Sequence, residues 1–445
     1  MKILLTVHQF FPQFAAGTEI LTYSVARELL KRGHEVRVLT GYPAPHALND
    51  ANRCDEYYFE GLHVYRFHHT YTPMGNQTSL LEIDYDNHLA AQYFRQILDS
   101  FNPDVVHFFH LHRLGTGLIE QVVEAGIPAF MTPTDFWTIC STAQLLLCDG
   151  QLCSGPSRYS GNCVKHFVQN TRKGLLGKIA RYLPTPLVDF LVYLTQIGVM
   201  PAYPHRIEVK AAGNRLGVNM ARLNQLNRIV SPTALMTERL VKYGVLPERI
   251  LQSAFGIDVT ATNTLRSSPR QPLRIGFIGT LATHKGCHVL IEAFKTLASG
   301  RAILKIYGSP TDFPDYASGL KQLAGNDNAI EFCGTFPNAN IADVLADLDV
   351  LVVPSLWYEN TPLVVYSAQA ARCPVVASNF AGLSDVIRHE DNGLLFKAGD
   401  VMALSEQLFR LINEPYLIEH LSTQARQPKS TSTYVDELIG VWQSV

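Results

Sequence analysis

Apolar and polar residues follow one another along the first 135 residues in the rhythm of strands separated by helices. Short apolar runs typical of buried strands occur at KILLTV, HEVRVLT, PDVVHFFH and IPAFMT. Between the first two runs, TEILTYSVARELLKRG places Leu21, Val25 and Leu29 on one helical face, with Thr18 as the expected N-cap and Gly33 as the end. A further helix is expected around residues 114–125. Strands joined by helices of this length predict βαβ units and a parallel sheet.

The same pattern starts again in residues 250–425. Strands are expected at LRIGFIG, AILKIYG, IEFCG, DVLVVPS and CPVVAS. The segment GCHVLIEAFKTLA predicts a helix whose apolar face holds Val289, Leu290, Ala293, Phe294 and Leu297. The fold class is therefore α/β, with two doubly wound, Rossmann-like parallel-sheet domains that face each other across a crevice.

We expect a first domain over residues 1–235 and a second over 236–425. A C-terminal helix is expected over residues 426–445, and it can cross back to the first domain. Residues 140–225 interrupt the strand–helix pattern and are interpreted as an insertion.

Two interpretations of this insertion stay open. Its helices either pack on the first domain or lie on an anionic membrane surface, because basic residues flank apolar ones. Those residues are Arg172, Lys173, Lys178 and Arg181, within a peripheral contact expected over 172–200. Pro184 and Pro186 interrupt any long helix there.

Composition narrows the class of protein. The chain has 445 residues, 47% of them hydrophobic, and a formal charge of -2 from 37 basic and 39 acidic side chains. This balance does not favour a nucleic-acid partner. The sequence contains no apolar run long enough to span a membrane, and its first residues do not resemble an export signal. We expect a cytoplasmic protein, either free or peripheral at the inner membrane face, whose eight cysteines are free thiols.

Two strand-to-helix turns are candidates for binding chemistry, because helix N-termini present free N–H groups at the carboxyl edge of a parallel sheet. Gly17, after the first strand, would allow a ligand close to the backbone. Gly279 ends a later strand, and Lys285 precedes the next helix, where an ammonium group would suit a diphosphate. The alternative for Lys285 is a solvated loop lysine. Neither turn has the G-x-G-x-x-G pattern of dinucleotide binding.

A third turn lies in VVPSLWYENTPLVVYSAQAA. Thr361 and Pro362 predict an N-cap followed by the first helical residue. Glu359 then lies just above the sheet, where it either stabilises the helix dipole or accepts hydrogen bonds from sugar hydroxyls.

Other polar groups suggest less specific sites. Asp347 and Asp349 have the spacing of a metal–diphosphate motif, but they precede their strand and are expected at the opposite edge of the sheet, in a surface role.

Four cysteines lie within 24 residues and could bind zinc, although they lack a C-x-x-C pair, namely Cys140, Cys148, Cys153 and Cys163. The histidines His107, His110 and His112 are interpreted as core or crevice residues, with a metal triad as the less favoured alternative.

Several ordered motifs together resemble a known family. FIGTLATHKGCHVLIEAF, VLVVPSLWYENTPLVVYSAQAARCPVVAS and AGLSDVIRHEDNGLLFKAGD resemble the C-terminal domain of retaining family 4 glycosyltransferases of GT-B architecture. AGTEILTYSVARELLKRGHEVRVLT and TDFWTIC are similar to the acceptor half of that family. The resemblance covers most of the chain outside residues 165–215.

The resemblance implies a nucleotide-sugar donor as co-substrate, held mainly by the second domain, an acceptor held by the first, and no required metal or other cofactor. It implies that Lys285 binds the leaving diphosphate and that Glu359 contacts sugar hydroxyls. The expected catalytic residues are Lys285, Glu359 and Asp135, and Asp135 lies on the acceptor side with Gly17. The expected donor-binding residues are Gly17, Gly279, Thr280, Lys285, Glu359, Asn360, Thr361, Leu363 and Ser367.

Three positions depart from the family pattern. Ser367 stands where a second glutamate is common, Thr280 where arginine is common, and Thr134 where a histidine precedes the aspartate. The leading hypothesis is a transferase that moves a sugar to a glycan, glycolipid or small acceptor. The departures motivate an alternative, a catalytically silent module that acts as a partner or scaffold. A dehydrogenase is disfavoured by the missing glycine-rich pattern.

Overall fold

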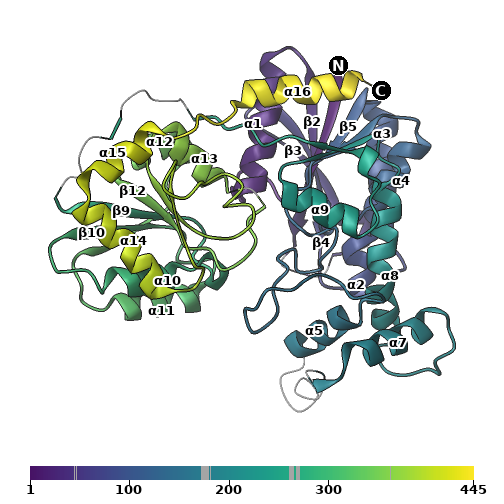
Figure 1. The fold of residues 1–445 in the computed structure, drawn as a ribbon. Helices are drawn as coiled ribbons and strands as arrows, with labels where there is room; N and C mark the ends of the chain where they lie inside the picture. Colours follow the sequence, from purple (N-terminus) through teal and green to yellow (C-terminus); the bar gives the residue numbers. More distant parts are fainter. Residues whose placement is uncertain are drawn as a thin grey trace. The chain divides into compact units, whose positions relative to one another are not determined.

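The computed structural model describes residues 1–44, 46, 48–171, 180, 182–259, 265–266, 271–360 and 362–444 (Figure 1). It divides into two compact units. Unit 1 comprises Met1–Ala254 and Thr431–Val445, and unit 2 comprises Phe255–Ser430.

Unit 1 is built on an eight-stranded sheet in the order β3-β4-β2-β1-β5-β6-β7-β8. Its strands pair in parallel, apart from the antiparallel pair β3–β4. The strands are β1 (Lys2–Val7), β2 (Glu35–Pro43), β3 (Cys54–Phe59), β4 (Leu62–His69), β5 (Val105–Phe108), β6 (Ala129–Met131), β7 (Arg228–Ser231) and β8 (Ile250–Gln252). All four residues of β5 are buried, as expected for a strand covered on both faces.

The helices of unit 1 begin with α1 (Gly17–Lys31), which starts two residues earlier than predicted. Ala16 is its N-cap, and the expected cap Thr18 instead donates its hydroxyl to Thr134. Gly33 ends the helix at φ 79°. The next helices are α2 (Leu80–Tyr85), α3 (His88–Phe101), α4 (Gly117–Glu124) and, after the insertion, α9 (Ala234–Lys242).

The division between the units lies after residue 254, later than the expected boundary at 235. The reason is strand β8, which pairs with β7 from Ile229↔Ile250 to Ser231↔Gln252 and so extends the first sheet. Helix α9 and β8 therefore belong to unit 1.

The C-terminal helix α16 (Thr431–Gln443) also belongs to unit 1, where it lies beside α1 (Figure 1). Arg32 of α1 donates to Asp436 at 2.5 Å and to the carbonyl of Ser432. Trp442 is buried and donates its indole N–H to His107 Nδ1 at 3.1 Å. His107 is itself fully buried and hydrogen bonded to Thr132, so it is a core residue.

In its described residues the insertion forms the helices α5 (Gly161–Thr171), α7 (Thr185–Gln196) and α8 (Arg206–Leu223) of unit 1. They pack on one another, and α8 also contacts α2 and α4. The basic residues singled out for membrane contact lie outside the described part of the chain, namely Arg172, Lys173, Lys178 and Arg181. Among the described residues, no helix combines the length and the apolarity needed to cross a bilayer.

Unit 2 holds a six-stranded, all-parallel sheet in the order β11-β10-β9-β12-β13-β14. Its strands are β9 (Leu273–Ile278), β10 (Ala302–Tyr307), β11 (Ile330–Gly334), β12 (Val350–Val353), β13 (Val375–Ser378) and β14 (Leu394–Phe396). Its helices are α10 (Cys287–Phe294), α11 (Pro314–Ala324), α12 (Ile341–Ala346), α13 (Leu363–Ala370), α14 (Val401–Asn413) and α15 (Pro415–Thr423). Alternate residues of β12 enter two separate apolar clusters, one on each face of the sheet. This explains why the strand is continuously apolar.

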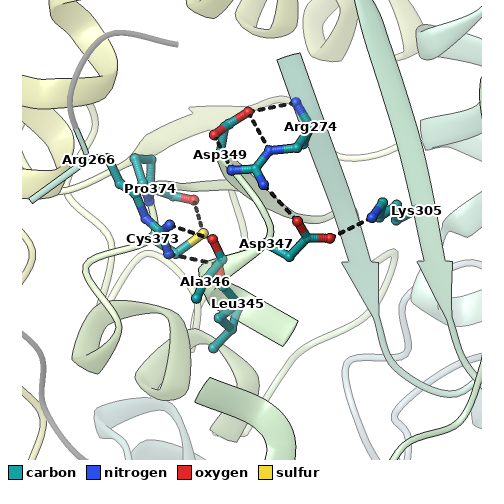
Figure 2. A network of polar contacts seen from close by, with 9 residues as sticks. All are labelled: Arg266, Arg274, Lys305, Leu345, Ala346, Asp347, Asp349, Cys373 and Pro374. Atoms are coloured by element: carbon teal, nitrogen blue, oxygen red, sulfur yellow. Dashed lines mark hydrogen bonds and ion pairs between the residues drawn. The ribbon is translucent and has the colours of Figure 1, made fainter. Parts of the chain in front are cut away.

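An ion-pair network ties the strands of unit 2 at the edge where β9 and β12 begin (Figure 2). Asp349 accepts hydrogen bonds from the Arg274 backbone N–H at 2.9 Å and from its guanidinium at 2.8 Å. The same guanidinium reaches Asp347 at 2.7 Å, and Lys305 of β10 adds a second contact to Asp347 at 2.5 Å. The two aspartates thus hold β9, β10 and β12 together. The expected surface role fits Asp347. Asp349 is instead 5% exposed, and its burial is tolerated because Arg274 compensates its charge.

We predict that Asp349→Ala lowers the free energy of unfolding by about 3 kcal/mol, because it leaves a largely buried guanidinium without its main partner. The matched variant Asp347→Ala removes a half-exposed carboxylate and should cost under about 1 kcal/mol. Denaturant midpoints measured on both proteins check this. Equal losses of unfolding free energy in the two variants would contradict the conclusion that Asp349 is the main partner of Arg274.

Candidate functional site

In each unit the strand order reverses direction beside the first strand, and the predicted site residues lie there. In unit 2 the chain moves outward from β9 through β10 to β11, then returns to add β12 on the other side of β9. Loops that leave neighbouring strands in opposite directions open a ligand position at the carboxyl edge of the sheet. The turn after β9 carries Gly279, Thr280 and Lys285, and the turn after β12 carries Ser355 and Glu359.

The contact between Lys285 and Glu359 joins these two turns. Lys285 Nζ donates to Glu359 Oε1 at 2.7 Å. The same carboxylate oxygen accepts from Ser355 Oγ at 2.6 Å and from the Trp357 indole N–H at 2.8 Å. Lys285 Nζ also lies 4.8 Å from the centre of the Trp357 ring. The sequence-predicted lysine and glutamate are therefore brought together, with Trp357 and Ser355 as supports.

Glu359 is ionised in this environment although it is only 5% exposed. Burial works to raise its pKa, but the charge of Lys285 and the hydrogen bonds from Lys285, Ser355 and Trp357 outweigh burial and hold the pKa below its ordinary value. For His284, which contacts Trp357, burial and the neighbouring Lys285 lower the pKa to about 4. The turn thus presents a neutral imidazole beside a compensated ion pair.

Two glycines allow the backbone of these turns to pack closely. Gly286 has φ 70°, and a Cβ there would lie 1.9 Å from the carbonyl oxygen of Pro354. Gly382 has φ 92°, and a Cβ there would lie 1.6 Å from the carbonyl oxygen of Glu359. Only glycine fits such positions without moving the backbone. The two glycines fix the turn after β12 from both sides.

Three further expected donor-binding residues, Asn360, Leu363 and Ser367, follow Glu359 along the chain. Asn360 is buried, and Leu363 is the first residue of α13. The helix was expected to begin at Pro362 with Thr361 as its cap. Pro362 is instead the N-cap, and Thr361 lies outside the described residues. Ser367 donates its hydroxyl to the carbonyl of Leu363 at 3.0 Å, within its own helix.

Unit 1 has its own reversal of strand order, between β1 and β5, and it gathers a group of imidazoles and carboxyls. His8 follows β1, while His110 and His112 follow β5. The rings of His8 and His110 lie 4.2 Å apart between centroids. His110 Nε2 lies 2.9 Å from Asp135 Oδ2, and the other oxygen of Asp135 accepts from the backbone N–H of Trp137. The predicted acceptor-side residue Asp135 is thus anchored at this edge, whereas Gly17 is an exposed first residue of α1.

The hydrogen bonds of His110 assign its two ring nitrogens different roles. Its Nδ1 accepts the backbone N–H of His112 at 3.1 Å, so Nε2 carries the proton and donates to Asp135. For Asp135, burial works to raise the pKa, but His110 and the other donors outweigh it and lower the pKa. Asp135 is therefore an ionised carboxylate whose side chain is 27% exposed.

Glu19, in the first turn of α1, lies behind His8 and was not singled out from the sequence. Its Oε1 is 3.6 Å from His8 Nε2, and the residue is 1% exposed. Burial raises its pKa to about 7, while backbone N–H groups and His110 act in the opposite direction. The sequence does contain a signal that could have identified Glu19. Glu19 shares the buried stripe of α1 with Thr22, Ala26 and Leu29, where an acidic residue has no ordinary place.

The four clustered cysteines do not form a metal-binding group among the described residues. Cys148 is exposed and hydrogen bonds Gln169, while Cys140 is buried. Within the described ranges, no three His, Cys, Asp or Glu side chains form a group that could hold a metal ion, and this includes the three histidines after β5.

Comparison with known proteins assigns the chain to a family. A family model described as Glycosyltransferase Family 4 matches residues 15–146, and a model described as glycosyl transferases group 1 matches residues 266–428. The chain belongs to glycosyltransferase family 4. The matched ranges contain Lys285 and Glu359 in unit 2 and Glu19, His110 and Asp135 in unit 1, whereas His8 lies ahead of the first range.

Curated relatives include the amylovoran biosynthesis glycosyltransferase AmsK of Erwinia amylovora, 29% identical over 200 residues that make up 43% of this chain and 49% of that protein. The D-inositol 3-phosphate glycosyltransferase of Rhodococcus opacus is 30% identical over 217 residues, 45% of this chain and 48% of that protein. The chain thus matches about half the length of these relatives.

Solved structures are similar over the whole chain. Anabaena Alr3699/HepE, in complex with UDP and glucose, superposes with a TM-score of 0.65 at 17% identity, covering 100% of both chains. Sucrose-phosphate synthase from Thermosynechococcus elongatus gives 0.65 at 16% identity, covering 100% of this chain and 98% of that one. With the two parallel-sheet units, these similarities show the GT-B fold of this family 4 member.

We predict that Gly382→Ala destabilises the protein by about 2–4 kcal/mol and weakens any ligand held at Glu359, because the new methyl group forces the turn away from its position. The matched control is Gly319→Ala, at a helical position of α11 with open space around it. That variant should be neutral or slightly stabilising. Thermal unfolding of both variants checks the prediction, and a stable Gly382→Ala protein would contradict the close approach.

Proposed function

We propose that the protein is a retaining glycosyltransferase that moves a sugar from a nucleotide-sugar donor to a hydroxyl group of a glycan or lipid-linked acceptor. The observation that carries the proposal is the 2.7 Å contact between Lys285 and Glu359 at the strand reversal of unit 2, inside the matched group 1 domain. The structurally similar HepE binds UDP and glucose in one complex and UDP-glucose in another, which supports a nucleotide-sugar donor.

The chemistry of the pair suits this role. An ammonium group has three N–H donors, and Glu359 accepts one of them, so Lys285 can also bind a diphosphate. As the nucleoside diphosphate leaves, negative charge grows on its oxygens, and a positioned ammonium stabilises that charge. Glu359, held ionised, accepts hydrogen bonds from hydroxyls of the transferred sugar. Retention at the anomeric carbon and the absence of a metal requirement belong to this proposal and rest on the sequence resemblance.

The silent-module alternative is less favoured. Thr280 and Ser367 remove two groups that the family pattern would supply, but the pair formed by Lys285 and Glu359 remains intact and supported. Thr134, the third departure, is hydrogen bonded to Thr18, so this substitution is accommodated within unit 1.

We predict that the purified protein releases a nucleoside diphosphate from one member of a panel of UDP-, GDP-, ADP- and TDP-sugars. Lys285→Ala should lower the release rate by about 100-fold, since it removes a charge that stabilises the leaving group. Lys321→Ala, an exposed lysine on α11 of the same unit, is the matched control and should leave the rate unchanged. If no donor is bound or turned over, the scaffold alternative would replace the transferase.

We further propose that the insertion contacts a membrane surface through residues 172–200. Within α7, the apolar side chains of Leu187, Phe190 and Leu191 are 46%, 54% and 39% exposed, and Ile197 and Val199 continue this apolar surface beyond the helix. The sequence places four basic residues just before it, which matches an anionic leaflet.

We expect the protein to co-sediment with phosphatidylglycerol vesicles and the double variant Leu187→Asp, Phe190→Asp to stay in the supernatant, because two charges would have to enter the apolar boundary. Met402→Asp, an exposed apolar residue of α14, controls for a general loss of apolar surface. Equal sedimentation of all three proteins would rule out contact through α7.

A further inference from the structure

The group formed by His8, Glu19, His110 and Asp135 contains polar atoms whose hydrogen-bonding capacity is unused. Among the described residues, neither Glu19 Oε2 nor His8 Nδ1 has a hydrogen-bond partner, although both atoms are buried. An unpaired buried polar atom costs free energy, and functional sites are where such a cost persists. His8 and Asp135 are also the members with exposed surface, with side chains 20% and 27% exposed.

The protonation states around His8 decide what it can offer a ligand. Burial, together with His110, His112 and His69, holds the pKa of His8 well below its ordinary value, so the ring stays neutral. A neutral imidazole has one donor and one acceptor nitrogen. When Glu19 carries a proton it donates toward Nε2, and the proton of His8 is then on Nδ1. When Glu19 is ionised it accepts from Nε2–H, and Nδ1 becomes an acceptor.

The observed separation of 3.6 Å between Glu19 Oε1 and His8 Nε2 is longer than a hydrogen bond. Contacts of this kind are often long in an unliganded site and shorten when the ligand binds. His8 directly follows β1 and Glu19 lies in the first turn of α1, and the binding geometry considered below requires the His8 ring to tilt so that Nε2 approaches Glu19 and the buried Nδ1 reaches the ligand.

The surrounding charges select the ligand class. Asp135 is ionised and its oxygens accept hydrogen bonds, so a ligand anion would be repelled, whereas a hydroxyl can donate to it. The oxygen of that hydroxyl then needs a donor, which His8 Nδ1–H supplies. A neutral carbohydrate hydroxyl fits this acceptor–donor pair, and a phosphate does not.

We propose that His8 and Asp135 bind one hydroxyl of an uncharged acceptor sugar in unit 1, and that Glu19 is a positioning residue whose proton keeps His8 Nδ1 a hydrogen-bond donor. The identification of this sugar as the acceptor rests on the proposed function. The binding chemistry itself rests on the geometry of unit 1. The site would bind best below about pH 7, where Glu19 keeps its proton.

Other titrating groups face the same site and must be separated from Glu19. His112 pairs with Asp84 at 2.9 Å, His110 pairs with Asp135, and burial lowers the pKa of His69 to about 3. The variant Glu19→Gln isolates the effect, since its amide mimics the neutral acid at every pH and leaves the histidines in place.

The test measures binding of glucose, galactose, mannose and N-acetylglucosamine to the full chain by saturation-transfer NMR at pH 6 and pH 8.5. We expect at least one sugar to bind the unmodified protein about fivefold more tightly at pH 6. Glu19→Gln should bind it equally at both values, near the affinity at pH 6. Glu19→Ala and His8→Phe should bind about tenfold more weakly. Glu124→Gln, an exposed glutamate of α4, is the matched control and should behave like the unmodified protein.

Three outcomes would overturn the proposal: no binding at pH 6 up to 200 mM sugar (about the weakest affinity of interest), an unchanged pH dependence in Glu19→Gln, or unchanged binding in His8→Phe. Displacement of the sugar by UDP-glucose would assign the site to the donor and contradict the acceptor assignment. Sugar binding with the expected pattern but without nucleotide release from any donor would contradict only the proposed function. Nucleotide release without that pattern would contradict only this inference.

Discussion

The reversal of strand order beside β1 and β9 is the constraint on which the chemistry of this protein depends. In a parallel sheet every loop at the carboxyl edge would otherwise turn to the same side and cover that edge. Because β5 adds beside β1, and β12 beside β9, two neighbouring loops diverge in each unit and leave polar side chains without a covering helix. Lys285 and Glu359 occupy this position in unit 2, and His8 and His110 occupy it in unit 1. Sequence-distant residues meet there because the topology brings their strands together.

In unit 2 the same two strands are fastened at both edges by ion pairs. Arg274 of β9 holds Asp349 ahead of β12, and Lys285, after β9, holds Glu359, after β12. Strand β12 has only four residues, so a displacement at one edge is transmitted directly to the other. We therefore infer that the pair of Arg274 and Asp349, where the strands begin, contributes to the position of the Glu359 carboxylate, where they end. Gly286 and Gly382 also hold the turn in place, because they allow the backbone to approach the carbonyl oxygens of Pro354 and Glu359 closely.

Much of this architecture could be predicted from the sequence, because continuous apolar runs and helical periodicity report burial directly. The pair formed by Lys285 and Glu359 was also accessible, since each residue lies at a strand-to-helix turn with a matching family motif. The remainder depended on contacts that local patterns do not encode. Strand β8 has two exposed residues out of three and gives a weak apolar signal, so the division between the units was placed too early. Glu19 became visible as a candidate only when α1 packed its first turn against His8, and Trp357 only when its indole reached Glu359.

The two units show how one topological position can serve different chemistry. At the reversal in unit 2, a lysine offsets a buried carboxylate, and in the proposed function this pair binds a diphosphate and a sugar. At the reversal in unit 1, imidazoles surround two carboxyl groups with opposite pKa shifts, since the contacts of Asp135 with His110 lower its pKa while burial raises the pKa of Glu19 to about 7. In the described residues neither carboxyl contacts a lysine or arginine, which favours the proposed binding of a hydroxyl over that of a phosphate. The loops, and the residues that fix their protonation, therefore decide which part of a transfer reaction each sheet can support.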